Sequence, residues 1–410
     1  MSWLYKVVHQ CRLCKGSKLE KLIDFGYVNL YTANTGNKVG VSDPNLHEKA
    51  PLNLLICLDC KNLQLAEVVN PNFLYKNFKY HTQVTFGLDE HFKVLANTIN
   101  SILQLGVTDH ILDIGSNDGT FLRNFLGRSK VLGIEPGVQI AKEANESGVK
   151  TLNRYFSSNL CAELLSDYGK FKVIFCANTI ANIDDLDEIF NSVRKVLLKD
   201  GYFILETQNG VDVLNKFLLD TVYHEHLTYF TLPALQSYVD KMGMRIDYIK
   251  HHNQKGGSIQ VWITHKVSKK FLQFKGSDIN YLETEAKVLD DVENLKKIIF
   301  KKINRVKKYL EKNFKKKVVG FGASVGTNTL LNLFCKDLKI SKIIDDKPAI
   351  NFLPFNNELI EIQKSSEFFK SKNSEKYILV FSYRYFDKIS KKYINEKAYN
   401  FFKIFNFKKL

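Results

Sequence analysis

Apolar strand-like runs alternate with helix-like runs through the middle of the chain. The runs "HILDI", "KVLGI", "FKVIFCA" and "GYFILETQ" begin at His110, Lys130, Phe171 and Gly201. Between them lie stretches with apolar residues at helical spacing, such as "VQIAKEANESG" and "DEIFNSVRKVLL". We expect the second of these helices to end at Gly201. The alternation predicts a parallel sheet with helices on both faces.

The two ends of the chain follow other patterns. Before residue 86 apolar residues are sparse, and "YTANTGNKVGVSDPNLHEKAP" is typical of a loop, so a core alone could not hold this block together. Near the other end, "YLETEAKVLDDVENLKKIIFKKINRVKKYLEKNF" predicts a long helical run in which we allow for one break. A strand, a Gly-rich turn, a helix and two further strands follow it. We therefore predict three domains, over residues 1–85, 86–265 and 266–410, the last a second and smaller α/β unit.

Composition and charge add limits to this picture. The 410 residues have an ordinary hydrophobic share of 45% and a net charge of +16, much of it from Lys after residue 290. Solvated Lys-rich helix faces explain most of this charge, so nucleic acid is a minor alternative, while a diphosphate-bearing substrate would suit a basic surface. No signal peptide and no apolar run of about 18 residues is visible, so we expect a cytoplasmic protein without a membrane partner. The oligomeric state stays open, and a monomer is compatible with the sequence.

Four of the seven cysteines form two C-x-x-C pairs. In a cytosolic chain this pattern indicates a metal site in preference to disulfides. Each pair can aim two sulfurs at one tetrahedral ion, and two pairs close its shell, so the zinc would be structural. Two chance pairs of buried or redox thiols are the alternative. The predicted ligands are Cys11, Cys14, Cys57 and Cys60.

The stretch "ILDIGSNDGTFL" has the form of strand, Gly-rich turn and helix. Its G-x-N-x-G spacing differs from that of dinucleotide sites and P-loops. An acidic residue at the end of the next strand suits the hydroxyl groups of a ribose. We interpret the region as a class I S-adenosylmethionine (SAM) site, with NAD binding or an empty crevice as alternatives. The predicted cofactor-binding residues are Gly115, Asn117, Gly119, Glu135 and Asn178.

A second Gly-rich turn, "GFGASVG", contains Gly320, Gly322 and Gly326. It permits two interpretations. The glycines could serve close packing between a strand and a helix, or the backbone N–H groups of Gly320, Gly322 and Ala323 could open toward the phosphate or nucleotide of a substrate.

The run "YHEH" places a phenol, two imidazoles and a carboxylate in consecutive positions, from Tyr223 to His226, just after the fourth strand. An imidazole of His224 or His226 could remove a proton near neutral pH, with Glu225 orienting it. Tyr223 could donate a hydrogen bond to an oxygen that gains negative charge. Transfer of a methyl group to carbon needs such a base and such a donor, because the carbon must first become a nucleophile. A polar surface turn is the alternative.

With these motifs, the sequence resembles the bacterial sugar C-methyltransferases that act on nucleotide-linked 4-keto-deoxysugars. The resemblance extends over nearly the whole chain and includes "DIGSNDGT", "YHEHLTYFTL", "GGSIQV", "GFGASVGTNTLLN" and "IIDDKP". It implies a small N-terminal zinc-binding domain, a central class I methyltransferase (Rossmann-like) domain, and a C-terminal Rossmann-like α/β domain that helps to hold the nucleotide sugar. It also implies methylation at C3, beside the C4 ketone. The resemblance makes His226 the base, assisted by Tyr223 and Glu225, and makes Tyr80 a substrate contact.

Three positions depart from the pattern of this family. Asn182 stands where a His is usual, Gln260 where an Arg is usual, and Gly326, Thr327 and Asn328 where "KGN" is common. We still include Asn182 and Asn328 among the predicted substrate-binding residues. The departures leave open the sugar, O- or N-methylation in place of C-methylation, or a homologue with reduced catalysis that binds zinc and a nucleotide.

Overall fold

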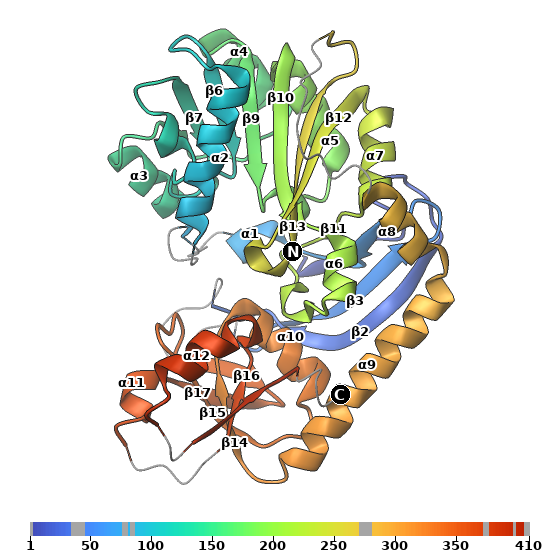
Figure 1. The fold of residues 1–410 in the computed structure, drawn as a ribbon, viewed down its shortest axis with the longest axis vertical. Helices are drawn as coiled ribbons and strands as arrows, with labels where there is room; N and C mark the ends of the chain where they lie inside the picture. The colour runs from blue at the N-terminus through green and yellow to red at the C-terminus, as the bar shows by residue number, and fades with distance from the viewer. Residues whose placement is uncertain are drawn as a thin grey trace.

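The computed structural model describes residues 3–33, 46–75, 81–82, 87–269, 281–371, 377–396 and 399–405. Figure 1 shows an upper lobe built from the middle of the chain and a lower lobe built from its C-terminal part. Two long N-terminal strands, β2 and β3, run between the lobes, and helix α9 extends from one lobe to the other. The strands of the described residues form four sheets.

Seven strands make the sheet of the upper lobe, in the order β12-β13-β10-β9-β6-β7-β8. Strands β8, β7, β6, β9 and β10 are parallel, whereas β13 is antiparallel to both of its neighbours. The strands are β6 (His110–Ile114), β7 (Lys130–Ile134), β8 (Thr151–Leu152), β9 (Phe171–Ala177), β10 (Leu197–Gln208), β12 (Met244–His252) and β13 (Ser258–His265).

Helices cover both faces of this sheet, as the alternation predicted. Residues of one strand alternate between the faces, so Ile111 packs with the cluster of helix α2, and Leu112 packs with the cluster of α5 and α7. The larger helices of the lobe are α2 (Leu88–Leu103), α3 (Val138–Glu146), α4 (Leu160–Asp167), α5 (Leu186–Val196) and α7 (Leu232–Lys241). The predicted α/β architecture is confirmed. The antiparallel strand β13 was not predicted from the sequence pattern.

One predicted boundary is wrong. Helix α5 ends at Val196, and Gly201 lies inside strand β10 instead of after the helix. Leu197 already pairs with Phe171 of β9, and the register shifts between Leu197 and Tyr202. Strand pairing therefore takes residues that the helical spacing of "RKVLL" assigned to the helix.

The N-terminal block contributes three strands of a four-stranded sheet in the order β11-β4-β3-β2, in which β11 comes from the middle of the chain, and a separate pair of β1 with β5. Its apolar side chains share one core with the C-terminal helices, as Phe25 and Leu54 do with Leu310 and Leu331. The sparse core of this block is thus completed by other parts of the chain. The elements are β1 (Tyr5–Val7), β2 (Leu19–Asn29), β3 (Lys49–Cys57), β4 (Leu63–Leu65), β5 (Glu67–Val69), α1 (Pro71–Tyr75) and β11 (Thr228–Tyr229).

The lower lobe holds a six-stranded sheet in the order β16-β17-β15-β14-β18-β19. The long helical run that precedes it breaks at Asp291, whose side chain caps α9 by accepting a hydrogen bond from the Asn294 amide. The elements are α8 (Tyr281–Asp290), α9 (Val292–Asn313), β14 (Val318–Phe321), α10 (Val325–Phe334), β15 (Ile340–Asp345), β16 (Phe352–Phe355), β17 (Glu358–Lys364), α11 (Ser365–Phe368), β18 (Tyr377–Val380), α12 (Phe386–Lys392) and β19 (Asn400–Lys403).

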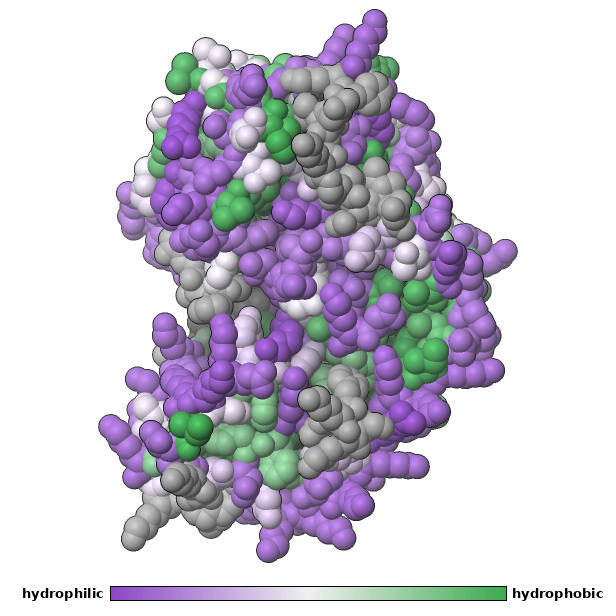
Figure 2. Space-filling model, viewed as in Figure 1, coloured by the Kyte–Doolittle hydropathy of each residue, from purple (hydrophilic) through white to green (hydrophobic). Residues whose placement is uncertain are grey.

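Short elements connect these sheets. They are η3 (Leu122–Phe125), η4 (Ile180–Asn182), α6 (Gly210–Asn215), η5 (Leu219–Thr221), η6 (Gln254–Gly256) and η7 (Tyr383–Tyr385). Hydrophilic side chains cover most of the face shown in Figure 2. Among the described residues, no helix combines the length and the apolar character that crossing a bilayer requires. The division into domains at residues 85 and 265 stays a prediction.

Candidate active site

A cavity of about 410 Å³ lies at the carboxyl ends of β6, β7 and β9. This is the end of the strands at which open α/β sheets bind their ligands. Of the predicted cofactor-binding residues, Gly115, Asn117, Glu135 and Asn178 line the cavity. Gly119 does not, because it packs behind the loop against Val149.

The loop after β6 approaches the cavity in a conformation that needs glycine. Gly115 has a φ of 73°, and a Cβ at this position would lie 2.2 Å from the Oγ1 atom of Thr179. Asn117 also has a positive φ, 50°, and its side-chain oxygen accepts hydrogen bonds from the backbone N and the hydroxyl of Thr82. The two positive φ values set the path of the loop along the cavity. The hydrogen bonds of Asn117 also fix the segment at residues 81–82.

The carboxylate of Glu135 is anchored by the backbone at the edge of the cavity. The N–H groups of Asn117 and Gly137 donate to its two oxygens at 3.0 and 2.7 Å. Desolvation raises the pKa of Glu135 above its ordinary value, although these two hydrogen bonds oppose the shift. Each oxygen keeps a lone pair for a further donor, so the carboxylate can accept hydrogen bonds from two adjacent hydroxyl groups, as a ribose presents them.

The same cavity is also lined by residues that follow β10 in the sequence, namely Tyr223, Glu225 and His226. The Nδ1 atom of His226 lies 3.1 Å from the carbonyl oxygen of Thr221, and its Nε2 atom lies 3.1 Å from the Tyr223 hydroxyl. Because a carbonyl only accepts, Nδ1 carries the proton and Nε2 accepts from Tyr223. The carbonyl of Thr221 thus orients the imidazole, in the place that we had predicted for Glu225.

Burial lowers the pKa of His226 to about 3, with the nearby charge of Lys255 as a second cause. The imidazole is therefore neutral at physiological pH and offers a lone pair on Nε2. His224 points elsewhere, because its Nε2 lies 3.0 Å from the carbonyl oxygen of Pro51 and the residue does not line the main cavity. We predicted His224 as a catalytic residue, but the structure places it in packing against the N-terminal sheet.

Asn182 lines the cavity together with the cofactor-binding loop and the "YHEH" run. Tyr75 lines the cavity as well, and desolvation raises the pKa of its phenol well above the ordinary value. The Oδ1 atom of Asn182 is buried and has no hydrogen-bond partner among the described residues. A substrate hydroxyl could supply the missing donor. Tyr80, the other predicted substrate contact from the loops, lies outside the described residues.

The "YHEH" run is held by elements from all three parts of the chain. The Leu227 carbonyl accepts from the Leu65 amide of the N-terminal sheet, and the Leu227 amide donates to Ala181 in the upper lobe. From the lower lobe, the Thr329 hydroxyl donates to the Val222 carbonyl at 2.7 Å. A docked assembly of the three parts is therefore needed to shape this wall of the cavity.

The second Gly-rich turn contacts the protein itself. A Cβ at Gly322 would lie 2.1 Å from the Ser382 hydroxyl, and one at Gly320 would lie 2.6 Å from the Phe381 ring. The amide of Gly322 donates to the Ile344 carbonyl, and that of Ala323 donates to the Asp345 carboxylate. The prediction that these amides open toward a phosphate is therefore wrong, and the packing interpretation holds.

Asn328 and Asn332 lie one helical turn apart on α10, and both face strand β2. Their side-chain amides donate to the carbonyls of alternate residues, Asn328 to Asn29 and Tyr31, and Asn332 to Phe25 and Tyr27. Asn328 does not line the main cavity. Our prediction of Asn328 as a substrate-binding residue is thus replaced by a role in joining α10 to the N-terminal sheet.

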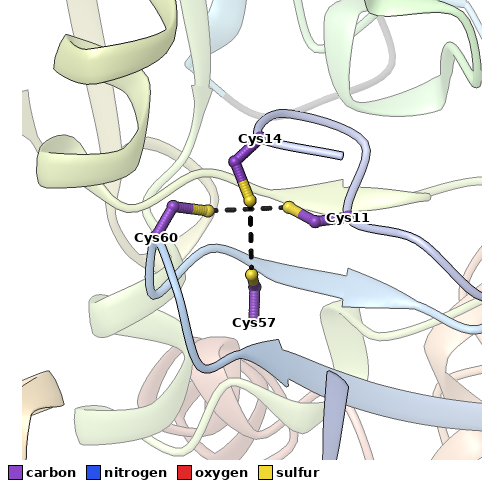
Figure 3. A group of neighbouring side chains, drawn as sticks. All are labelled: Cys11, Cys14, Cys57 and Cys60. Atoms are coloured by element: carbon purple, nitrogen blue, oxygen red, sulfur yellow. Dashed lines mark hydrogen bonds between the residues drawn. The ribbon is translucent and has the colours of Figure 1, made fainter. Parts of the chain in front are cut away.

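The four predicted zinc ligands converge on one point (Figure 3). The sulfur pairs Cys11–Cys60 and Cys14–Cys57 are each 3.5 Å apart, and all four sulfurs lie within 4.8 Å of one another. Sulfurs bound tetrahedrally at about 2.3 Å from zinc stand roughly 3.8 Å apart, so the cluster fits the ion. Four thiolates would fill the shell of a structural Zn²⁺.

The two C-x-x-C pairs share a local fold. Each is followed by a lysine with a φ of 65°, Lys15 and Lys61, whose amide donates to the carbonyl of the first cysteine of the pair. This turn directs both sulfurs of a pair to the same side, and it recurs because both segments have the pattern C-x-x-C-K.

Several residues of the cavity were missed by the sequence analysis. Tyr75, Thr179, Tyr155 and Lys255 line it. Lys255 carried a usable signal, because it directly precedes the quoted "GGSIQV". Thr179 directly follows the predicted Asn178, whereas Tyr75 and Tyr155 lie in segments without a recognisable pattern, and only the fold brings them to the site.

Comparison with known proteins adds three family models that match successive parts of the chain. A zinc binding domain matches residues 11–75, a methyltransferase domain matches 86–249, and a C-methyltransferase C-terminal domain matches 253–402. The C-methyltransferase NovU of Streptomyces niveus is 27% identical over 264 residues, which are 64% of this chain and 62% of that protein. The match thus spans less than two thirds of the relative's length.

Solved structures of methyltransferases are similar to part of the chain. A SAM-dependent methyltransferase from Clostridium acetobutylicum is 14% identical, with a TM-score of 0.35, and covers 43% of this chain and 91% of its own. The plantazolicin methyltransferase BpumL in complex with SAH is 15% identical, with a TM-score of 0.35, and covers 44% and 86%.

The seven-stranded sheet, the Gly-rich loop with its acidic partner and the family model of the middle segment together define a class I methyltransferase domain, and the four cysteines beside it could hold one metal ion. The models that flank this segment are more specific. They describe a zinc binding domain and a C-methyltransferase C-terminal domain, and NovU is named a C-methyltransferase, so the chain is similar to C-methyltransferases.

Proposed function

We propose that the protein methylates C3 of a nucleotide-linked 4-keto-deoxysugar through an enolate. The observation that carries this proposal is the neutral imidazole of His226, fixed between the Thr221 carbonyl and the Tyr223 hydroxyl in the cavity that Glu135 and Gly115 also line. When bound, SAM supplies an electrophilic methyl group. Gly115, Asn117, Glu135 and Asn178 would hold it.

In this proposal, His226 accepts the proton from C3 on its Nε2 atom. A pKa lowered to about 3 makes the imidazole a weak base, so the enolate has to be stabilised as it forms. The Tyr223 hydroxyl could stabilise it. When the substrate enters, this hydroxyl would stop donating to Nε2 of His226 and would donate its hydrogen bond to the C4 oxygen instead. Lys255 lines the same cavity and adds a positive charge there. Asn182 would accept a hydrogen bond from a sugar hydroxyl.

The family resemblance supports the substrate class, and NovU is named a C-methyltransferase. A sugar linked to a nucleoside diphosphate also suits the net charge of +16. We therefore propose a nucleotide sugar as the partner, with no nucleic acid or membrane. O- or N-methylation and reduced catalysis are the competing outcomes.

The test is mass spectrometry of nucleotide-linked 4-keto-6-deoxysugars incubated with the protein in deuterated water, with and without SAM. We expect deuterium uptake at carbon without SAM and the gain of one methyl group with it. His226→Gln should lose about 10²–10⁴ in both rates, because a positioned base is removed. His224→Gln is the matched control and should keep both activities.

Methylation at oxygen or nitrogen would contradict C-methylation. Full turnover of His226→Gln would remove the role of His226 and leave the class of reaction intact. Neither methylation nor exchange, in a protein that binds SAM, would favour a homologue with reduced catalysis.

A further inference from the structure

A second cluster of metal-ligating side chains lies away from the zinc site. His91 comes from helix α2, Glu206 from the end of β10, and His252 from the end of β12. The potential ligand atoms of the three residues all lie within 4.8 Å of one another. The sequence shows no spacing that announces this cluster, because the three residues are distant along the chain.

Glu206 is the centre of the cluster. It is 1% exposed, and its two carboxylate oxygens lie 2.9 and 2.8 Å from the Nε2 atom of His91. The Nε2 atom of His252 lies 3.5 Å from one of these oxygens. Ligands bound tetrahedrally at about 2.1 Å from a metal stand roughly 3.4 Å apart. The separation from Glu206 to His252 is therefore close to that of two ligands of one ion, whereas His91 lies at hydrogen-bond distance and would move outward by about 0.5 Å to share the ion.

His252 provides an independent observation. Its side chain is 11% exposed, and neither ring nitrogen has a hydrogen-bond partner among the described residues. A buried polar group without a partner costs about 1–3 kcal/mol. The ring lies against that of His91, with centroids 4.8 Å apart, so both imidazoles sit beside the same carboxylate. A hydrogen-bonded pair of His91 with Glu206 would explain those two residues, but it leaves His252 without a function.

A neighbouring side chain supports Glu206. Gln260 donates to a Glu206 oxygen at 3.3 Å, and its own oxygen accepts from the Trp262 indole at 3.0 Å. The orientation of the Gln260 amide is thus fixed, with its N–H group directed at the carboxylate. Such a partner is typical of the residues that orient the ligands of a metal.

We propose that His91, Glu206 and His252 bind a divalent transition-metal ion. Two imidazoles and one carboxylate suit Zn²⁺, Fe²⁺ or Co²⁺, whereas Mg²⁺ and Ca²⁺ prefer oxygen ligands. Three protein ligands leave at least one coordination position open.

This site would lie directly behind the wall of the main cavity. The amide of Asn178, which lines the cavity, donates to the Glu206 carbonyl at 2.7 Å. Leu88 and Phe92, on either side of His91 along α2, also line it. An ion here would fix the positions of α2, β10 and β12 around the cavity, whatever the methyl acceptor is.

The test uses the full chain with zinc in its four-cysteine site. Zinc content is measured first, Co²⁺ is then added, and the metals are counted after desalting. We expect one zinc and one cobalt per chain, the cobalt with weak visible bands and no thiolate-to-metal charge-transfer band. His252→Ala should lose the cobalt, keep the zinc and keep its fold by circular dichroism. Gln260→Ala should weaken cobalt binding about 10–100-fold.

His110→Ala is the control, because this partly exposed histidine lies outside the cluster, and it should bind cobalt as the wild type does. The proposal is overturned if the wild type takes up no second metal, or if His252→Ala and His91→Ala both retain it. Cobalt that displaces zinc and shows a strong charge-transfer band would place it at the cysteines and would also overturn the proposal.

Discussion

Two Gly-rich turns of this protein look alike in sequence and differ in what they contact. In both, a buried strand ends in glycines and the following strand ends in an acid, Glu135 or Asp345, that accepts from an amide of the turn. The turn at Gly115 faces the cavity of about 410 Å³. The turn at Gly322 is filled by Phe381 and Ser382 of the protein itself.

The comparison teaches that a Gly-rich turn shows only that something approaches the backbone closely. Whether this is a ligand or a side chain depends on the next strand in the sheet. After β9 the chain turns through Asn178 and Thr179 and leaves a cavity. After β18 it turns back over the glycines, and the amide of Phe381 donates to the carbonyl of Phe321.

The largest effect should separate the two turns directly. Gly115→Ala puts a Cβ 2.2 Å from Thr179 in a backbone with a φ of 73°, which should lower the free energy of unfolding by about 1–3 kcal/mol. Because Gly115 and Thr179 both line the cavity, we expect SAM affinity to fall as well, by at least about 100-fold. Gly322→Ala, with its Cβ 2.1 Å from Ser382 and a φ of 102°, should lower the free energy of unfolding by about 1–3 kcal/mol and leave SAM affinity unchanged. Calorimetric titration measures the SAM affinity, and urea unfolding measures the free energy of unfolding. Equal loss of SAM affinity in the two variants would end the distinction.

A smaller effect is expected at the two acids. Glu135→Gln removes the charge that faces the cavity, and we expect SAM to bind about 10–100-fold more weakly, since hydrogen bonds to charged groups contribute about 1.5–3 kcal/mol. Asp345→Asn is the matched change in the second turn and should affect unfolding alone. If Asp345→Asn weakens SAM binding as much as Glu135→Gln does, the second turn takes part in the site.

The smallest effect concerns the segment that runs between the two turns. Burial lowers the pKa of His224 to about 4, below its ordinary 6.5, so the unfolded chain binds this proton more readily. The contribution of the neutral His224 to the free energy of unfolding is therefore fully present above pH 6.5 and is lost as the pH falls toward 4. His224→Gln should reduce this loss by about 2 kcal/mol at pH 5 in urea unfolding. His110→Gln serves as the control, and an unchanged pH dependence in His224→Gln would contradict a buried neutral His224.

Much of the fold was predictable, because its strands are short apolar runs separated by amphipathic helices. The zinc ligands were predictable too, since two C-x-x-C pairs leave few other uses for four thiols in one block. The site was predictable where it depends on local motifs, as at Gly115, Glu135 and His226, whose placement in one cavity agrees with the analysis and whose roles stay predictions.

The remaining parts depend on contacts between distant segments. The sequence does not show that Thr221, and not Glu225, orients His226, because a carbonyl leaves no trace in a motif. It does not show that His224 turns toward Pro51, since neighbours in a turn can point to opposite sides. The helix expected to reach Gly201 ends at Val196 because strand pairing outweighs helical spacing.

The side-chain amides of Asn328 and Asn332 on helix α10 have a consequence for fragments of this chain. Strand β2 is the last strand of its sheet, and a strand in this position offers its free carbonyls to any passing strand. Asn328 and Asn332 occupy three of these carbonyls and that of Tyr31 just beyond the strand, and side-chain amides cannot continue the ladder. The C-terminal part thus closes the edge of the N-terminal sheet, and a fragment without α10 would present that edge to the strands of other copies.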